Sequence, residues 1–320
     1  MDSQTICIIG GTGFVGRHLI YRLARAGHRL RVLTRRRERH RNLIVIPEVT
    51  LVETNIHDSK QLRAQMADCE TVINLAGILN EGRSKQHRFQ LVHVELPRRI
   101  IEAANLSKVR RLLHMSALNA APSEPNSCYL RTKGEGEDLA HQAAGELEVT
   151  IFRPSVIFGP DDDFFNRFQR LLRMTPLMFP LACPESRFAP VYVGDVAKAF
   201  AKALSDKTSF GKRYELCGPQ QFTLRELVQY TARNSGLRRK IIGLGNMASR
   251  LQAHVLGLVP GKPFSLDNYY SLQHPSVCAD PGLERLGITP TPIDAIVPMY
   301  LGNRHTRARY YDWRRWAGRG

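Results

Sequence analysis

A tyrosine and a lysine four positions apart, with a serine upstream, are the residues whose types and spacing suit redox chemistry. Tyr129 and Lys133 lie on one face of a predicted helix, because side chains at i and i+4 are neighbours on a helix. Ser116 stands thirteen residues before the tyrosine, at the predicted end of a strand. We expect the lysine to lower the pKa of the tyrosine and to bind a nicotinamide ribose. The tyrosine would then exchange a proton with a carbonyl or alcohol oxygen that the serine polarises.

A glycine-rich run between the first predicted strand and the first predicted helix is typical of a dinucleotide-binding loop. Gly10 permits a tight turn, Gly13 lets a pyrophosphate approach the backbone, and Gly16 lets the helix pack closely on the strand. The N-terminus of the helix adds N–H donors and the positive end of its dipole. A purely structural glycine turn is the alternative interpretation.

The end of the second predicted strand indicates which dinucleotide is bound. NAD sites place an acidic residue here for the ribose 2′-hydroxyl, whereas this chain has Arg35 and Arg36 directly after Thr34. Arginine binds a 2′-phosphate through charge-assisted hydrogen bonds. NADP(H) is therefore the favoured cofactor over NAD(H). A solvated basic loop is the alternative, and it suits the later arginines of this loop better, namely Arg37, Arg39 and Arg41.

Two further strand ends face the same predicted site. Asn55 and Ile56 follow the third strand, where an adenine is usually held, and the asparagine side chain can hydrogen-bond the amino group of the base. Asp58 is better explained as the N-cap of the next helix. The fourth strand ends with small residues that could let a cofactor pass, in the run Asn74, Leu75, Ala76 and Gly77. No metal site is predicted.

These residues need an α/β fold to position them. The first 160 residues alternate short β-rich runs with helical stretches, which predicts a Rossmann-like, doubly wound parallel sheet. The predicted strands are 5–10, 29–34, 50–53, 71–76, 110–116 and 148–153. The predicted helices are 14–26, 60–67, 89–104 and 129–144. Residues 161–320 form a smaller, irregular C-terminal lobe whose chain crosses back to the sheet, with strands at 191–193 and 213–216 and helices at 195–204 and 224–235.

The composition of the 320 residues is that of a globular protein, because 43% are hydrophobic and 23% are charged. Disordered and collagen-like chains are thereby excluded. No apolar run approaches the ~18 residues that a membrane-spanning helix needs, and the first residues resemble neither a signal peptide nor an Arg-rich presequence. Six widely spaced cysteines without a C-x-x-C pair predict neither a zinc site nor a disulfide framework. We therefore expect a protein of the reducing cytoplasm.

The net charge of +17 is concentrated in two clusters. Residues 1–41 hold ten arginines against Asp2 and Glu38, and residues 304–320 hold six arginines against Asp312. Such clusters indicate anionic partners, namely phosphates, an anionic lipid surface or an acidic protein. Solubility together with a general use of arginine is the alternative.

Several motifs give the chain a resemblance to a known family. It resembles the extended or atypical branch of the short-chain dehydrogenase/reductase superfamily. Within that branch it is most similar to the NADPH-binding accessory subunit family (alpha subcomplex subunit nine) of respiratory complex I and its bacterial relatives. The motifs that carry the resemblance span nearly the whole chain: 10–16, 129–133 with 136–137, 153–159, 163–168, 190–196 and 283–292.

The resemblance implies roles for particular residues. The pyrophosphate would contact the glycine loop through Gly10, Thr12, Gly13, Phe14, Val15 and Gly16. Arg35 and Arg36 would hold the 2′-phosphate. The nicotinamide half would lie among Tyr129, Lys133, Pro154, Val156 and Ile157. The family also implies tight NADPH binding, and partners in the respiratory chain or in quinone biosynthesis, at the membrane surface.

Two segments bear on the partner. Residues 241–259 combine apolar and basic side chains, which is typical either of an amphipathic surface segment or of a helix packed on the core. The tail, 304–320, mixes arginine with Tyr310, Tyr311, Trp313 and Trp316. That mixture suits a bilayer interface, a nucleic acid or a protein hot spot, and a solvated end is the remaining alternative.

Three functions follow from these observations. The first is a cofactor-bound accessory or assembly protein, peripheral on the inner face of the cytoplasmic membrane. The second is an NADPH-dependent reductase or dehydrogenase of a lipophilic carbonyl, a quinone-related compound or a nucleotide sugar. The third is a nucleic-acid-binding regulator, which only the net charge favours, so a nucleic-acid partner is not expected.

Overall fold

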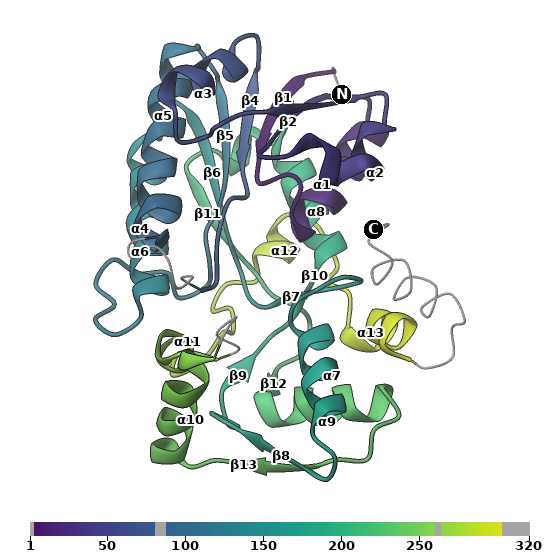
Figure 1. The fold of residues 1–320 in the computed structure, drawn as a ribbon. Helices are drawn as coiled ribbons and strands as arrows, with labels where there is room; N and C mark the ends of the chain where they lie inside the picture. Colours follow the sequence, from purple (N-terminus) through teal and green to yellow (C-terminus); the bar gives the residue numbers. More distant parts are fainter. Residues whose placement is uncertain (1–2, 81–87, 260–263, 303–320) are drawn as a thin grey trace.

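The computed structural model describes residues 3–80, 88–259 and 264–302, and its centre is a seven-stranded parallel sheet (Figure 1). The strand order is β11-β6-β5-β4-β1-β2-β3. Strand β1 is the apolar run Ile6 to Ile9, and all four residues are fully buried because helices cover both faces of the sheet. The strands are β1 (Thr5–Ile9), β2 (Arg29–Thr34), β3 (Val49–Glu53), β4 (Thr71–Asn74), β5 (Arg111–Met115), β6 (Glu148–Pro154) and β11 (Lys212–Leu216).

Each face of the sheet packs against its own set of helices. One hydrophobic core joins the sheet to α1 (Phe14–Arg25), α8 (Val193–Ala203) and α12 (Gly282–Arg285). The other core joins it to α3 (Ser59–Met66), α5 (Leu96–Leu106) and α6 (Cys128–Gln142). The predicted Rossmann-like fold is therefore confirmed. Short turns η1 (Arg37–His40) and α2 (Arg41–Ile44) connect β2 to β3.

The predicted elements of the first half agree with the structure within two residues at each end, with one exception. The predicted helix 89–104 is divided into α4 (Arg88–Gln90), a π-helical turn η2 (Leu91–Glu95) and α5. At this turn α6 crosses so closely that a Cβ on Gly136 would lie 1.7 Å from the carbonyl oxygen of His93. A widened turn is a common feature of functional sites, and nothing in the local periodicity signals it.

In the described residues, the C-terminal lobe is built from three two-stranded sheets and a helical layer, and three late elements, β11, α8 and α12, return to the large sheet. Strand β11 pairs with β6, and α8 packs beside α1. The strands of the lobe are β7 (Ile157–Phe158), β8 (Met178–Leu181), β9 (Arg187–Phe188), β10 (Val191–Tyr192), β12 (Phe222–Thr223) and β13 (Lys240–Gly243). Its other helices are α7 (Phe165–Met174), η3 (Lys207–Ser209), α9 (Leu224–Asn234), α10 (Asn246–Leu258), α11 (Leu266–Ser271) and α13 (Ile293–Leu301).

Buried carboxylates fasten the late segments of the chain. Asp162 accepts hydrogen bonds from the Tyr300 hydroxyl (2.6 Å) and from the backbone N–H of Gly159 (3.1 Å). Asp195, which is fully buried, accepts one from the backbone N–H of Thr291 (2.7 Å). Hydrogen bonds of this kind offset the cost of burying a charge, and they hold α13 and the 290–292 turn against the rest of the protein.

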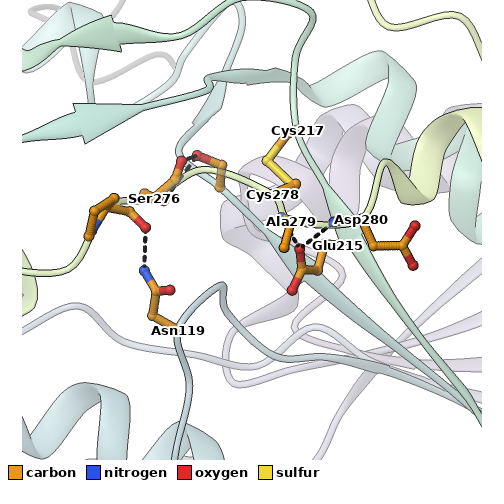
Figure 2. Close-up of a disulfide and its surroundings, with 9 residues drawn as sticks. Asn119, Glu215, Cys217, Ser276, Cys278, Ala279 and Asp280 are labelled. Carbon is orange, nitrogen blue, oxygen red and sulfur yellow. Dashed lines mark hydrogen bonds between the residues drawn. A yellow bond between two sulfur atoms is a disulfide. The ribbon is translucent and has the colours of Figure 1, made fainter.

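A disulfide corrects one expectation from the sequence. Cys217 follows β11, Cys278 precedes α12, and the two are bonded although they are 61 residues apart (Figure 2). Glu215 lies beside the bond and accepts from the backbone N–H of Ala279 (2.8 Å) and of Asp280 (3.2 Å). The prediction of no disulfide was wrong because the pairing depends on how the chain returns to the sheet, which the cysteine spacing does not show. The arginine-aromatic tail, 304–320, lies outside the described residues.

Within the described ranges, every helix is too short or too polar to cross a bilayer.

Candidate functional site

The glycine loop has the geometry of a pyrophosphate cradle. Gly10 has φ +77°, and a Cβ there would lie 2.8 Å from the backbone nitrogen of Ala76, so only glycine fits. A Cβ on Gly16 would lie 2.3 Å from the carbonyl oxygen of Gly11, which is how closely α1 packs on the loop. Gly13 is the N-cap of α1 and brings no side chain to the first N–H groups of the helix. Those donors face the carboxyl edge of the sheet, ready for an anion.

The two arginines after β2 are exposed beside this loop. Leu33 pairs with Ile9 across the β1–β2 ladder, so Arg35 and Arg36 leave the sheet next to Gly10. The backbone N–H of Arg36 donates to Thr34 Oγ1 (3.4 Å), which turns the chain over the sheet edge. Both guanidinium groups therefore stand free of the core at the predicted position for a 2′-phosphate.

At the end of the third strand, the polar groups of Asn55 already make hydrogen bonds within the protein. Asn55 Oδ1 accepts from the backbone N–H of His57 (3.1 Å), and the N–H of Asn55 donates to Gln61 Oε1 (3.2 Å), so much of its hydrogen bonding shapes a turn. Ile56 is half-buried against the core. Asp58 caps α3 by accepting from the N–H groups of Lys60 and Gln61, as predicted.

The end of the fourth strand lies close to Lys133. Leu75 is buried, Ala76 is half-buried and its N–H donates to Asn74 Oδ1 (3.1 Å), and Gly77 is exposed. A Cβ on Gly77 would lie 3.4 Å from Lys133 Nζ. The glycine loop, the β4 edge and Lys133 are therefore assembled side by side.

Lys133 and Ser116 are both buried, and they lie close to the end of β5. Lys133 is 5% exposed, and its ammonium donates to the carbonyl oxygen of Met115 (2.9 Å). Burial lowers the pKa of Lys133 to about 8, while the Glu137 carboxylate opposes this shift. The Oγ of Ser116 is buried and has no hydrogen-bond partner among the described residues. An unsatisfied hydroxyl of this kind is costly unless a ligand completes it.

The 154–157 segment continues this edge from β6. Pro154 is buried, and its carbonyl oxygen accepts from the N–H of Leu118 (3.1 Å). The carbonyl oxygen of Val156 accepts from the N–H of Val191 (2.9 Å), and both Val156 and Ile157 are half-buried. The chain just after β5 and the chain just after β6 thus lie together at the carboxyl edge, where ligands bind in open α/β sheets.

Tyr129 departs from one expectation. Its pKa is raised to about 12, first by burial and then by the Asp267 carboxylate, whereas the sequence predicted that Lys133 would lower it. Its ring instead contacts Phe89 and His93, at centroid distances of 6.0 and 5.6 Å. The phenol is therefore protonated at neutral pH.

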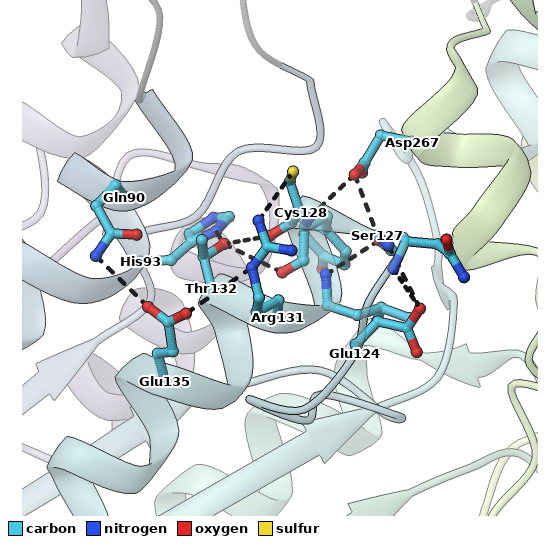
Figure 3. Close-up of polar contacts among 12 residues, drawn as sticks. Gln90, His93, Glu124, Ser127, Cys128, Arg131, Thr132, Glu135 and Asp267 are labelled. Carbon is cyan, nitrogen blue, oxygen red and sulfur yellow. Dashed lines mark hydrogen bonds and ion pairs between the residues drawn. The ribbon is translucent and has the colours of Figure 1, made fainter.

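Figure 3 shows the polar contacts that hold the start of α6. Asp267 from α11 accepts from the backbone N–H of Tyr129 (3.2 Å) and from Ser127 Oγ (3.5 Å). Ser127 caps α6 by accepting from the N–H of Leu130 (3.2 Å). The C-terminal lobe therefore places a carboxylate next to the tyrosine, and the sequence contained no signal for this contact.

Two buried histidines complete the site and were missed as members of it. His93 Nε2 accepts from the N–H of Ile78 (3.1 Å), and its Nδ1 lies 3.0 Å from Thr132 Oγ1. His114 Nδ1 lies 3.2 Å from Asn74 Nδ2. Burial and then the Lys133 charge lower the pKa of His93 to about 2 and that of His114 to about 3, so both rings are neutral. Their only sequence signal is a polar residue in an otherwise apolar core segment.

Comparison with known proteins agrees with this geometry. The model of the NAD dependent epimerase/dehydratase family matches residues 6–217. The mitochondrial NADH dehydrogenase [ubiquinone] 1 alpha subcomplex subunit 9 of Mus musculus is 29% identical over 314 residues, covering 96% of this chain and 81% of that protein. A ceramide reductase of Caulobacter vibrioides is 33% identical over 195 residues, covering 60% of this chain and 58% of that protein.

A solved structure shows the same fold. The NADPH-dependent quinone oxidoreductase QOR2 of Escherichia coli, complexed with NADPH, superposes with a TM-score of 0.73 at 19% identity, covering 92% of this chain and 99% of that one. The family match and the Rossmann-like sheet together confirm the resemblance inferred from the motifs. The chain belongs to the NAD dependent epimerase/dehydratase family, the extended branch of the short-chain dehydrogenases/reductases, and its relatives include accessory subunits of respiratory complex I.

Proposed function

We propose that this chain is an NADP(H)-binding accessory or assembly protein that acts with respiratory-chain or quinone-biosynthesis proteins, peripherally on the inner face of the cytoplasmic membrane. The similarity to complex I subunits, which covers 96% of the chain, carries the proposal. The similarity continues through the C-terminal lobe, beyond residues 6–217, which the family model matches. A shared lobe supports a shared kind of partner.

The cofactor proposal is NADP(H) rather than NAD(H). Arg35 and Arg36 are exposed at the end of β2, and the carboxylate of Glu53 on the neighbouring strand is engaged by the backbone N–H of Arg37 (3.1 Å). The glycine loop would hold the pyrophosphate, and Asn55 and Ile56 the adenine. The nicotinamide half would be held by Tyr129, Lys133, Pro154, Val156 and Ile157.

A pull-down from gently solubilised membranes tests this function. The tagged full chain is recovered, and mass spectrometry identifies its bound proteins and its nucleotide. We expect respiratory-complex or quinone-biosynthesis proteins together with NADP(H). Recovery of the NADP(H)-loaded protein without such partners would contradict the accessory role.

A working reductase is the second candidate, and the unsatisfied Ser116 hydroxyl favours it. When bound, NADPH supplies a hydride. Tyr129, protonated because its pKa is about 12, would donate a proton to the substrate oxygen, with Ser116 polarising that oxygen and Lys133 binding the ribose. A protonated tyrosine suits reduction of a carbonyl better than oxidation of an alcohol.

Replacing Tyr129 with Phe separates the two functions. The change keeps the ring that packs on Phe89 and His93 and removes only the hydroxyl. For an accessory protein we expect the variant to recover the same partners and nucleotide as the original chain. If the variant instead loses a carbonyl-dependent oxidation of NADPH that the original chain performs, the protein is a reductase.

A further inference from the structure

We infer that the distal end of the C-terminal lobe is a docking surface for an anionic lipid bilayer. The surface, called here the apolar–basic face, consists of the exposed apolar side chains within residues 174–178 and 242–259 and of the basic residues Arg173, Arg238, Lys240 and Arg250. In Figure 1 the elements that carry it, β8, β13 and α10, lie at the end of the molecule opposite the large sheet.

Exposed apolar side chains are concentrated on this face. Of the fourteen large apolar side chains that are exposed in the described part of the chain, nine fall within these two short segments. Isolated exposed apolar residues are ordinary, but a contiguous group marks an interaction surface.

Helix α10 packs on the protein along one side and exposes an apolar stripe along the opposite side. Ser249 and Ala253 are buried, and Gln252 Nε2 donates to the carbonyl oxygen of Pro180 in β8 (3.1 Å). The opposite side carries Met247 and Leu251, which are 89% and 65% exposed, followed by Val255 and Leu258. These four recur at i, i+4, i+8 and i+11, so they form one stripe along the helix.

The paired strands beside α10 continue the same pattern. Residues that pair in a parallel ladder point to the same side of it, and Met178 pairs with Lys240 while Pro180 pairs with Ile242. All four are exposed, whereas Phe179 and Leu181, which alternate with Met178 and Pro180 along β8, are buried in the core of the lobe. One side of the ribbon is thus anchored, and the other presents methionine, isoleucine, proline and lysine outward.

The charge of the face favours an anionic bilayer as the occupant. Neither residues 171–184 nor residues 227–259 contain an Asp or Glu, and Arg173, Arg238, Lys240 and Arg250 have no ion pair with a described carboxylate. An anionic bilayer offers phosphates to the cations and a hydrocarbon boundary to the apolar stripe, and it repels carboxylates, which this face lacks.

This inference adds to the proposed function the surface through which the protein would bind a membrane. It rests on the proposed function for one point, namely which membrane that is. The test is co-sedimentation of the full chain with vesicles of phosphatidylcholine, or of phosphatidylcholine mixed with phosphatidylglycerol. We expect binding to the anionic vesicles that weakens with salt and with removal of the phosphatidylglycerol. Absence of binding to the anionic vesicles would overturn the inference.

Two pairs of substitutions locate the binding. Met247→Ser with Leu251→Ser should weaken partitioning of the protein onto the anionic vesicles about tenfold, because two apolar side chains that would enter the bilayer are removed. Its matched control is Val45→Ser with Leu106→Ser, which removes two apolar side chains of comparable exposure from the far end of the protein. Arg238→Glu with Arg250→Glu should weaken partitioning about tenfold or more. The control is Arg98→Glu with Arg110→Glu, which changes two exposed arginines outside this face and outside the basic clusters at 1–41 and 304–320.

The outcomes are distinct from those of the functional test. NADPH binding by each variant shows that it is folded. If both pairs bind vesicles as the original chain does, or if the face captures a protein partner without lipid, the bilayer assignment is wrong even where the pull-down supports the accessory role. If the vesicles are bound through this face and the pull-down recovers no partner, the proposed function fails alone.

Discussion

The glycine-loop side and the lysine side of the candidate site lie at the same sheet edge but are built differently. The glycine-loop side consists of backbone and exposed arginines, with Gly10 and Gly16 defining its shape. The lysine side consists of buried polar side chains, among them Lys133, His93 and His114. A site made of backbone is costly to change sterically, whereas a site made of buried ionisable groups responds to pH. The predictions below test this difference.

The largest expected effect is a loss of stability at acid pH that originates in the buried histidines of the lysine side. Folded His93 and His114 have pKa values of about 2 and about 3, so below pH 6.5 they bind protons only when the chain unfolds. The free energy of unfolding should therefore fall as the pH drops from 6.5 toward 3, by about 2 kcal/mol per histidine at pH 5. Urea unfolding at pH 7, 6 and 5 measures this loss.

Replacing one of the two histidines tests whether it is the source of this pH dependence. His93→Gln should make the free energy of unfolding less dependent on pH, whatever its effect at pH 7. Equal pH dependence for the original chain and His93→Gln would show that this ring is not the source.

The second largest effect is expected from adding a side chain on the glycine-loop side. Gly16→Ala places a Cβ 2.3 Å from the backbone of Gly11, so α1 must shift. We expect a loss of about 3 kcal/mol in the free energy of unfolding, together with weaker NADPH binding. Gly245→Ala, where no atom lies within 4 Å of the added Cβ, is the control. If both cost the same, close packing is not what requires glycine at position 16.

The smallest effect should come from an exposed arginine. Arg35→Ala removes an exposed cation, so stability should be unchanged. The affinity for NADPH should fall about tenfold, because one charge-assisted hydrogen bond is lost. NADH affinity, measured by the same fluorescence titration, should stay the same. An equal loss for both nucleotides would place the 2′-phosphate elsewhere.

The same contrast explains what the sequence could predict. The loop from Gly10 to Gly16 is local, so its spacing between a strand and a helix was enough to predict its conformation. The contacts of His93 were not predictable, because they depend on a π-helical turn that packs closely against Gly136, more than forty residues later. Likewise Asp267 reaches Tyr129 only through the packing of α11 on α6. Each site residue that the sequence did not predict belongs to the site through tertiary contacts with residues far away in the chain.

The Cys217–Cys278 bond closes a covalent ring that contains α9, β13, α10 and α11. A protease that cuts the chain once anywhere between these two cysteines would produce two fragments that remain joined by the sulfur bridge. On a denaturing gel the nicked protein would run as one species without reductant and as two with it. The lobe that carries the apolar–basic face is thus tied to the nucleotide-binding sheet at both ends, and a single backbone cleavage would leave them attached.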